Sequence, residues 1–578
     1  MSEVPLLEIR GLTVSYRTRT GRLTAVRGVD LDVHPGEIVA LVGESGSGKS
    51  TTAHAVPRLL ADNAVIDAGR IRFAGQDLTR LPERALRAVR GVRIGLVPQD
   101  PTVSLNPVKR VGEQVAEVLR LHGLATRRSA SAAAVQVLER AGLPDPEVRA
   151  RQYPHELSGG MRQRALIAIA VAASPELIVA DEPTSALDVT VQRRILDHLE
   201  HLTGELGSAV LLVTHDLGVA ADRAQRIVVM SQGRVVEAGP TRRILDDPQD
   251  AYTRRLLRSA PSITAVRPRV RPASASSSGA SSSGTASSGT GSNGTAPLVV
   301  AEHLVKEFPL PQGRGAARTV RAVDDVGLTV HRGRTLALVG ESGSGKSTTA
   351  RLVLRLAEPS SGRIVFDGED VTAVGGAALR RLRRRAQLVY QNPYASLDPR
   401  FSIGEVITEP LRAFRIGDRA SRTARARELL DRVALPAATL DRRPAELSGG
   451  QRQRVAIARA LALEPDLVVC DEPVSALDVS VQAQVLELLA ELQADMGVAY
   501  LFISHDLAVV RQIAHRVAVL KDGRVVETGP TEQIFGTPAH PHTRELLAAI
   551  PGRRARAGTA PGRTSTGGAE MTTAGTDA

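Results

Sequence analysis

Gly43-Glu-Ser-Gly-Ser-Gly-Lys-Ser-Thr-Thr52 is repeated without change at Gly340–Thr349. Each copy fits the pattern G-x-x-x-x-G-K-[ST], which is typical of a loop that cradles nucleotide phosphates. Glycines let consecutive backbone N–H groups turn toward an anion, and a following helix points its positive end at the same place. Apolar, strand-like runs precede both copies, as this kind of loop requires. The sequence therefore predicts two nucleotide-phosphate sites.

Every position of the two loops is a candidate contact with the nucleotide. We expect Lys49 and Lys346 to reach the β- and γ-phosphates, and Ser50 and Ser347 to ligate Mg²⁺. The other candidate residues of the loops are Gly43, Glu44, Ser45, Gly46, Ser47, Gly48, Thr51, Gly340, Glu341, Ser342, Gly343, Ser344, Gly345 and Thr348.

The composition narrows the class of protein. The chain has 578 residues, 42% of them hydrophobic, which suits several domains with large cores. A single cysteine, Cys470, excludes a disulfide framework and suits a reducing cytosol. The net charge of +12 raises the question of nucleic acid, but aromatic residues are only 2% and Trp is absent. Base-stacking surfaces are therefore not expected, nor is a nucleic-acid partner.

No stretch of the sequence has the ~18 uninterrupted apolar residues of a membrane span. The nine-residue apolar run Ala165–Ala173 suits a buried helix better. The first residues lack the charged and apolar regions of a signal peptide, so none is predicted.

The two halves share more than the phosphate loop. The signature serine precedes an acidic pair by 23 residues in both halves, and the pair's aspartate precedes a histidine by 34 in both. Strands that alternate with helical runs predict a parallel α/β core in each half. The further matched strings are Leu157-Ser-Gly-Gly160 with Leu447-Ser-Gly-Gly450, Asp181-Glu182 with Asp471-Glu472, and His215 with His505.

A segment of different composition separates the halves. Ala273–Ala296 contains almost only Ser, Gly, Ala and Thr, which is typical of a flexible tether. As a random coil its 24 residues would span about 27 Å. We expect a first domain at 5–262, a linker at 263–296, a second domain at 297–551 and a disordered tail at 552–578.

Together these motifs resemble the nucleotide-binding domains of ABC transporters, because the LSGG string separates that family from other P-loop ATPases. The chain resembles two such domains fused, over about residues 5–262 and 297–551. The resemblance implies an α/β fold with two RecA-like P-loop ATPase domains. Each would carry an antiparallel β subdomain and a helical subdomain with the signature. It also implies an ATPase that uses ATP and Mg²⁺ and couples hydrolysis to transport.

The resemblance assigns chemical roles by position. The aspartates Asp181 and Asp471 would hold Mg²⁺ through water, as the second part of a metal site formed with Ser50 and Ser347. The expected catalytic residues are Glu182 and Glu472 as bases for the attacking water, His215 and His505 as switch histidines at the γ-phosphate, and Gln99 and Gln391 as glutamine-loop residues that touch Mg²⁺ or water.

Two aromatic residues upstream of the phosphate loops are candidates for stacking on adenine. They are Tyr16 in the first half and Phe308 in the second, and a buried core aromatic is the alternative interpretation for both. In this family the signature of one domain completes the site of the other. Ser158, Gly159 and Gly160 would therefore contact ATP held by Lys346, and Ser448, Gly449 and Gly450 ATP held by Lys49. Head-to-tail pairing of the halves and two hydrolytic sites follow.

Further strings resemble di- and oligopeptide importer ATPases. They follow the glutamine loops, at Gln99–Pro107 and Gln391–Pro399, and end the domains, at Pro248–Leu257 and Pro538–Leu547. This resemblance implies two integral-membrane permease subunits, an extracytoplasmic substrate-binding protein and a peripheral place at the cytoplasmic face of the inner membrane. An importer of nickel, glutathione or another small solute is an alternative within the family. A soluble ABC-F-type translation factor is a distant one, and the composition of the linker argues against it.

Overall fold

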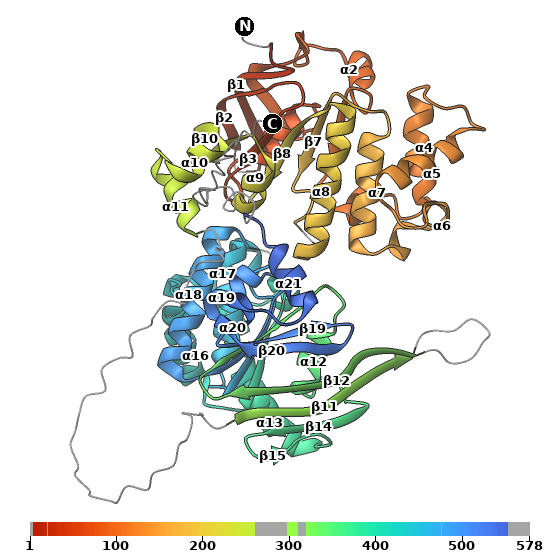
Figure 1. Cartoon of the computed structure of the whole chain (residues 1–578). Coiled ribbons are helices and arrows are strands. Elements are labelled where there is room, and N and C mark those ends of the chain that lie inside the picture. Colours follow the sequence, from red (N-terminus) through yellow and green to blue (C-terminus); the bar gives the residue numbers. More distant parts are fainter. Residues whose placement is uncertain are drawn as a thin grey trace, which may run out of the picture.

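The computed structural model describes residues 4–19, 21–185, 187–259, 297–309, 319–475 and 477–552. The linker expected at 263–296 lies outside these residues, as does the chain after Gly552. Figure 1 shows the first half, red to yellow, above the second half, green to blue. Each half has the two-sheet organisation and the helical arm that the resemblance to ABC ATPase domains implies.

The first half contains an antiparallel sheet and a mainly parallel core sheet. The antiparallel sheet has the order β2-β1-β4-β5, and the core sheet has the order β10-β9-β3-β8-β7-β6. Within the core sheet only β10 runs antiparallel to its neighbour. The strands are β1 (Leu7–Thr18), β2 (Gly21–Val33), β3 (Ile38–Val42), β4 (Ala64–Phe73), β5 (Gln76–Asp77), β6 (Ile94–Val97), β7 (Leu177–Asp181), β8 (Ala209–Thr214), β9 (Arg226–Ser231) and β10 (Arg234–Pro240).

The second half repeats this topology. Its antiparallel sheet has the order β12-β11-β14-β15 and its core sheet the order β16-β17-β18-β13-β19-β20. The strands are β11 (Pro297–Pro309), β12 (Thr319–His331), β13 (Thr335–Val339), β14 (Ser361–Phe366), β15 (Glu369–Asp370), β16 (Ala386–Val389), β17 (Leu467–Asp471), β18 (Ala499–Ile503), β19 (Arg516–Lys521) and β20 (Arg524–Pro530).

Helices of the first half cover the core sheet and build the helical arm. The helix after the first phosphate loop ends at Ala55, and Pro57 cannot donate the hydrogen bond that would continue it. The helices are α1 (Lys49–Ala55), α2 (Glu83–Val89), α3 (Pro101–Ser104), α4 (Val111–Leu121), α5 (Ala130–Arg140), α6 (Pro146–Ala150), the 3₁₀ helix η1 (Pro154–Glu156), α7 (Gly159–Val171), α8 (Val189–Leu206), α9 (Leu217–Arg223), α10 (Thr241–Asp246) and α11 (Ala251–Ser259).

The second half has matching helices. The helix after its phosphate loop ends at Val353 without a proline, so the proline of the first half is not required for this boundary. The helices are α12 (Lys346–Val353), α13 (Gly376–Arg385), α14 (Pro393–Ser396), α15 (Ile403–Ala413), α16 (Arg419–Arg432), the 3₁₀ helices η2 (Ala437–Asp441) and η3 (Pro444–Glu446), α17 (Gly449–Leu461), α18 (Val479–Met496), α19 (Leu507–Ile513), α20 (Thr531–Gly536) and α21 (Pro541–Ala548).

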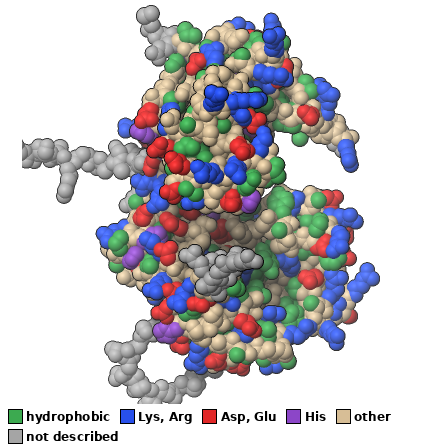
Figure 2. All heavy atoms as spheres, turned by 90° about the vertical axis from the view of Figure 1, so that its right-hand side faces the viewer, with side chains coloured by type: hydrophobic (Ala, Val, Ile, Leu, Met, Phe, Trp, Pro, Cys, Tyr) green, Lys and Arg blue, Asp and Glu red, His purple; other side chains and the backbone are tan. Residues whose placement is uncertain are grey.

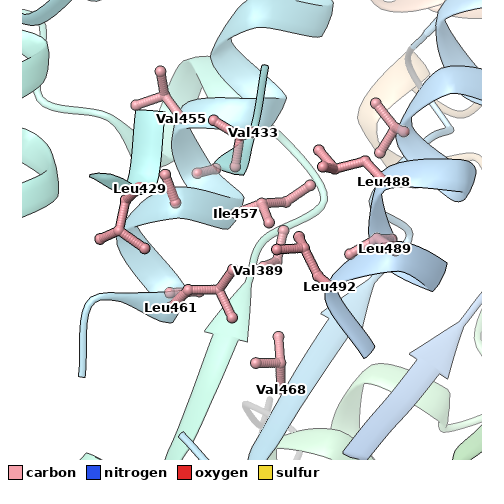
Figure 3. Close-up of a cluster of buried hydrophobic side chains, with 14 of the residues drawn as sticks. Val389, Leu429, Val433, Val455, Ile457, Leu461, Val468, Leu488, Leu489 and Leu492 are labelled. Carbon is pink, nitrogen blue, oxygen red and sulfur yellow. The ribbon is translucent and has the colours of Figure 1, made fainter. Parts of the chain in front are cut away.

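The hydrophobic core of the second half joins its core sheet to its helical arm. Figure 3 shows Leu429 and Ile457 from the arm in one cluster with Val389 from β16 and Leu492 from α18. All four side chains are at most 3% exposed. This continuous packing fixes α17, which carries the second signature at its start, relative to the sheet that carries the acidic pair.

The core strands are short apolar runs because both of their faces are covered. All five residues of β7 are buried, and so are all six of β8. Because β3, β7 and β8 run parallel, their carboxyl ends lie at the same end of the sheet. The phosphate loop, the acidic pair and His215 follow these three strands, so the topology brings them together.

Within the described ranges, none of the helices is long and apolar enough to cross a bilayer. In the space-filling view of Figure 2, Lys and Arg side chains are interspersed with Asp and Glu rather than gathered over one element, and a hollow lies between the two halves.

Candidate active site

Both P-loop lysines are buried within their own loops. Lys49 Nζ donates to the carbonyl oxygens of Gly43 and Glu44, at 2.8 and 2.9 Å. Lys346 makes the matching pair of bonds in the second half, at 2.8 and 2.7 Å. Burial lowers the pKa of both lysines below the ordinary value, and acidic residues around each loop oppose the shift. The two ammonium groups are therefore held under the loops, beside the acidic pairs.

An oxygen-donor site for a hard cation lies beside each lysine. Ser50 Oγ donates to Asp181 Oδ1 at 2.9 Å, and Ser347 Oγ donates to Asp471 Oδ1 at the same distance. Hydroxyl and carboxylate oxygens are the ligands that Mg²⁺ prefers, so these residues fit the ion. Burial raises the pKa of Asp471. The halves also differ here, because His54 Nε2 lies 3.1 Å from Asp181 Oδ2.

Glu182 is the centre of a polar cluster at the end of β7. Its Oε2 accepts a hydrogen bond from Gln99 Nε2 at 2.9 Å and lies 3.2 Å from His215 Nδ1. Its backbone φ of 45° lies in the left-handed region, where a non-glycine residue is strained. Burial alone would raise the pKa of Glu182, but His215, Lys49 and Gln99 hold the pKa below its ordinary value. The side chain of Glu182 is therefore a carboxylate whose direction is fixed by Gln99 and His215.

The second half reproduces this cluster. Gln391 Nε2 donates to Glu472 Oε2 at 2.8 Å, and His505 Nδ1 lies 3.1 Å from Glu472 Oε1. Glu472 has a φ of 46°. Burial would lower the pKa of His505, yet the Glu472 carboxylate raises it above the ordinary value, and the same holds for His215 beside Glu182. The structure therefore brings the glutamine, glutamate and histidine of each half together.

The two halves contact each other through the aspartates that end two matched SALD strings, Ser185-Ala-Leu-Asp188 and Ser475-Ala-Leu-Asp478. Asp478 Oδ1 accepts from the backbone N–H of Ser45 at 2.8 Å, and Asp188 Oδ2 accepts from that of Ser342 at 3.3 Å. Thr190 Oγ1 also donates to a carboxylate oxygen of Glu341 in the opposite loop, at 2.8 Å. Each phosphate loop is therefore bonded to the other half.

A cavity of about 100 Å³ lies between the halves. Its lining includes the glutamate and histidine of both clusters, namely Glu182, His215, Glu472 and His505. The two glutamate–histidine clusters thus face one shared space.

The signature residues begin long helices. Ser158 caps α7 by accepting from the backbone N–H of Met161, and Ser448 caps α17 by accepting from that of Gln451. A Cβ at Gly160 would lie 2.7 Å from Val191 Cγ1, so α8 passes too close for a side chain. Gly159 and Gly449 are the first residues of the two helices, and Gly450 lies even closer to α18 than Gly160 does to α8.

The two aromatic candidates lie in different surroundings. Tyr16 Oη lies 3.0 Å from Thr51 Oγ1, beside the first phosphate loop. Phe308 is 43% exposed, and Lys306 Nζ lies 5.3 Å from the centre of its ring. Neither residue belongs to the hydrophobic core. The alternative interpretation, a buried core aromatic, therefore does not hold for either of them.

Some residues at the site are absent from the candidates that the sequence provided. Tyr252 Oη accepts from the backbone N–H of Glu44 in the phosphate loop, at 3.0 Å. The matching residue of the second half is His542, whose side chain is buried and whose pKa is lowered by that burial. Asp188 and Asp478 are also absent from those candidates. Their repetition in both halves was the available signal, but nothing local indicated the opposite loop as their partner.

Two P-loop sites, each with a glutamate–histidine pair and a nearby LSGG helix, define an ATPase of the ABC class with two nucleotide-binding domains. The ABC transporter family model matches residues 26–185 and 323–475, more than half of the chain. The chain therefore belongs to the ABC transporter family. A second model, described as the C-terminal region of oligopeptide/dipeptide transporters, matches residues 236–284 and 526–573.

Curated relatives cover nearly the whole chain. The glutathione import ATP-binding protein GsiA of Pectobacterium atrosepticum is 45% identical over 95% of this chain and 90% of its own length. The oligopeptide transport ATP-binding protein OppD of Mycobacterium tuberculosis is 44% identical over 95% of this chain and 98% of its own. A solved dimer of the ATP-binding cassette MJ0796 with ADP and Pi is 30% identical over 40% of this chain and 99% of its own, with a TM-score of 0.37. The chain is an ATP-binding subunit of an ABC importer and an ATPase.

Proposed function

We propose that this chain drives the import of di- or oligopeptides by hydrolysing ATP at two sites. One observation carries the cargo assignment: both halves match the C-terminal region of oligopeptide/dipeptide transporters. The fusion of two such halves supplies the pair of domains that ATP-driven closure needs. The partners would be two integral-membrane permease subunits and an extracytoplasmic substrate-binding protein. The chain would lie at the cytoplasmic face of the inner membrane.

The proposed chemistry divides between the loop and the acidic pair. Lys49 and Lys346, with the backbone N–H groups of their loops, would hold the nucleotide phosphates. Ser50 with Asp181, and Ser347 with Asp471, would hold Mg²⁺, which neutralises charge on the phosphate oxygens when bound. These assignments are supported by the paired oxygen atoms at 2.9 Å in both halves.

Glu182 and Glu472 would accept a proton from the water that attacks the γ-phosphorus. Their lowered pKa keeps them as carboxylates near neutral pH, as a base requires. The histidines would orient these carboxylates and contact the γ-phosphate, and Gln99 and Gln391 would place the water or touch the metal. The left-handed backbone at both glutamates supports a functional reason for their direction.

The signature helices would complete each site from the opposite half. Ser158, Gly159 and Gly160 would face the nucleotide of the second loop, and Ser448, Gly449 and Gly450 that of the first. The bonds from Asp478 and Asp188 to the opposite phosphate loops support this head-to-tail pairing. Tyr16 and Phe308 would stack on adenine, with Tyr16 the better placed beside its loop.

Glutathione is the second candidate cargo, because a relative named as a glutathione import protein is as similar as the one named for oligopeptides. The test is ATP hydrolysis by the chain assembled with its permease subunits in proteoliposomes that enclose the binding protein. Peptides of two to five residues should stimulate hydrolysis, and their d-amino-acid counterparts serve as a matched control. Stimulation by glutathione alone would replace peptide as the cargo, and stimulation only by Ni²⁺ would overturn both.

A further inference from the structure

The last described segment of the second half lies on the first half. Helix α21 contacts α8 of the first half, as Figure 1 shows, and the chain after α21 continues across α9. The Gly552 backbone N–H donates to Asp222 Oδ2 at 2.8 Å, and Arg193 Nη1 donates to the carbonyl oxygen of Ala548 at 2.6 Å. We call residues 548–552 the strap.

The strap is anchored on its own half and seated tightly on the other. Ile550 is 3% exposed and belongs to the same buried cluster as Val339 of the second core sheet. On the first half, a Cβ built at Gly218 would lie 2.9 Å from the carbonyl carbon and the Cβ of Pro551. Only a residue without a side chain fits at that point of α9. Movement of one half against the other must therefore move or release this contact.

The place where the strap lies connects it to the active site. Gly218 is the third residue after His215, and Asp216 caps α9 by accepting from its backbone N–H at 2.7 Å. Pro551 lines the same cavity as Glu182 and His215. Displacing the strap would free the start of α9 and the loop that carries the histidine.

The residues of the first half that contact the strap differ from those at the matched positions of the second half. Arg193, Arg194, Gly218 and Asp222 contact the strap or its helix. Their counterparts in the second half are found by counting the same number of positions from Asp478 for the two arginines and from His505 for Gly218 and Asp222. These are Ala483, Gln484, Ala508 and Gln512, which lack the guanidinium groups, the carboxylate and the space for a close approach.

We propose that the strap couples the position of the second half to His215 of the first half, and that Gly218, Asp222 and Pro551 are positioning residues for that site. Among the described residues, this contact joins the end of the second half to the site of the first half. The two ATP sites are then chemically alike but differ in how interdomain movement reaches them. This inference rests on the proposed role of Glu182 and His215 in hydrolysis.

The test compares Gly218→Ala with its mirror image, Ala508→Gly, in the intact chain. Alanine is the better helix former, and Ala508 shows that the matched helix accepts it, so Gly218→Ala should fold. We expect hydrogen–deuterium exchange in 217–223 and 546–552 to rise about tenfold in Gly218→Ala. In Ala508→Gly it should rise only in 507–513. Wild-type exchange in Gly218→Ala, or an equal rise of 546–552 in both variants, overturns the strap.

Catalysis provides the second measurement. Gly218→Ala and Asp222→Ala should lower kcat by about threefold with KM for ATP within twofold, since the bound nucleotide is not touched. Asp222→Asn keeps an acceptor oxygen for Gly552 and should recover most of the rate. Raised exchange with an unchanged kcat overturns the coupling. A wild-type chain without ATPase activity would refute the proposed function instead, because the exchange experiment needs no hydrolysis.

Discussion

His215 Nδ1 lies 3.2 Å from Glu182 Oε2, and the second half repeats the pairing between His505 and Glu472 at 3.1 Å. Parallel pairing of β7 with β8, and of β17 with β18, brings these residues to one edge although 33 positions separate them. Both glutamates share a left-handed backbone. The two halves therefore hold this carboxylate on the same backbone conformation.

Replacing a glutamate with glutamine removes the proposed base and keeps the shape of the side chain. We expect Glu182→Gln to lower the total ATPase rate by at least about half, and Glu182→Gln with Glu472→Gln to lower it by about 10²-fold or more. Binding of a fluorescent ATP analogue should stay within about twofold, because the phosphate loops are intact. Phosphate release measures the first effect and fluorescence titration the second. A normal rate in Glu182→Gln alone would contradict two working sites.

The glutamate–histidine pairs predict a pH-dependent stability. Burial alone would lower the pKa of His215 and His505. The neighbouring glutamate carboxylates raise it by more than burial lowers it, so the net shift is upward. The contribution is therefore complete below the unfolded histidine pKa of about 6.5 and lost as pH rises through the raised folded values. Wild type should melt above His215→Gln/His505→Gln by a larger margin at about pH 6 than at about pH 9. Equal margins measured by scanning calorimetry would contradict the pairing.

Asp478 tests the contact between the halves. Its carboxylate accepts from Ser45 in the opposite loop, and such a charged hydrogen bond contributes about 1.5–3 kcal/mol. Asp478→Ala should therefore weaken apparent ATP affinity by about tenfold, with Asp478→Asn close to wild type. Asp188→Ala is the matched variant, and it should also lower the melting temperature because Asp188 caps α8 by accepting from the backbone N–H of Val191. Equal affinities in all variants would contradict the role of the contact.

Tyr252 tests whether the C-terminal region acts on the phosphate loop. Tyr252→Phe removes the acceptor for the Glu44 N–H and should destabilise the loop by about 1 kcal/mol, which corresponds to a fivefold rise in KM for ATP. Tyr153→Phe changes a tyrosine of the helical arm far along the chain and should leave KM unchanged. If both variants have the same KM in steady-state assays, the contact has no bearing on nucleotide binding.

The sequence predicted best what is local and repeated. The P-loop lysines, the acidic pairs and the histidines follow core strands in both halves, so parallel-sheet topology alone brings them together. The bond from Gln99 to Glu182 was not predicted, since the resemblance directed that glutamine to the metal or water.

Contacts between distant segments could not be predicted from the sequence. Tyr252 lies 208 positions from Glu44, and Asp478 lies 433 from Ser45. Each bond joins a side chain to a backbone N–H, a donor that almost every residue offers, so no residue pattern marks the partner. The contact of the strap with α9 could not be predicted from the sequence either. Glycine at position 218, where the second half has alanine, is explained only by the close approach of Pro551.

The signature glycines allow a packing role to be separated from a role at the nucleotide. A Cβ at Gly450 would lie 2.3 Å from Val481 Cγ1, and one at Gly160 would lie 2.7 Å from Val191 Cγ1. Gly450→Ala should therefore cost about 1–3 kcal/mol of stability by overpacking against α18. Val481→Ala removes the clashing methyl groups and should restore the melting temperature of Gly450→Ala.

If Gly450 also faces the nucleotide of the first loop, the double variant Gly450→Ala/Val481→Ala should recover stability but not the ATPase rate. The added methyl group would still stand between the helix and the γ-phosphate, where close approach of the backbone is needed. Val481→Ala alone serves as the control for the loss of packing. Recovery of both stability and rate in the double variant would assign Gly450 to packing against α18 alone, and the opposite half would then complete the site through Ser448 and Asp478.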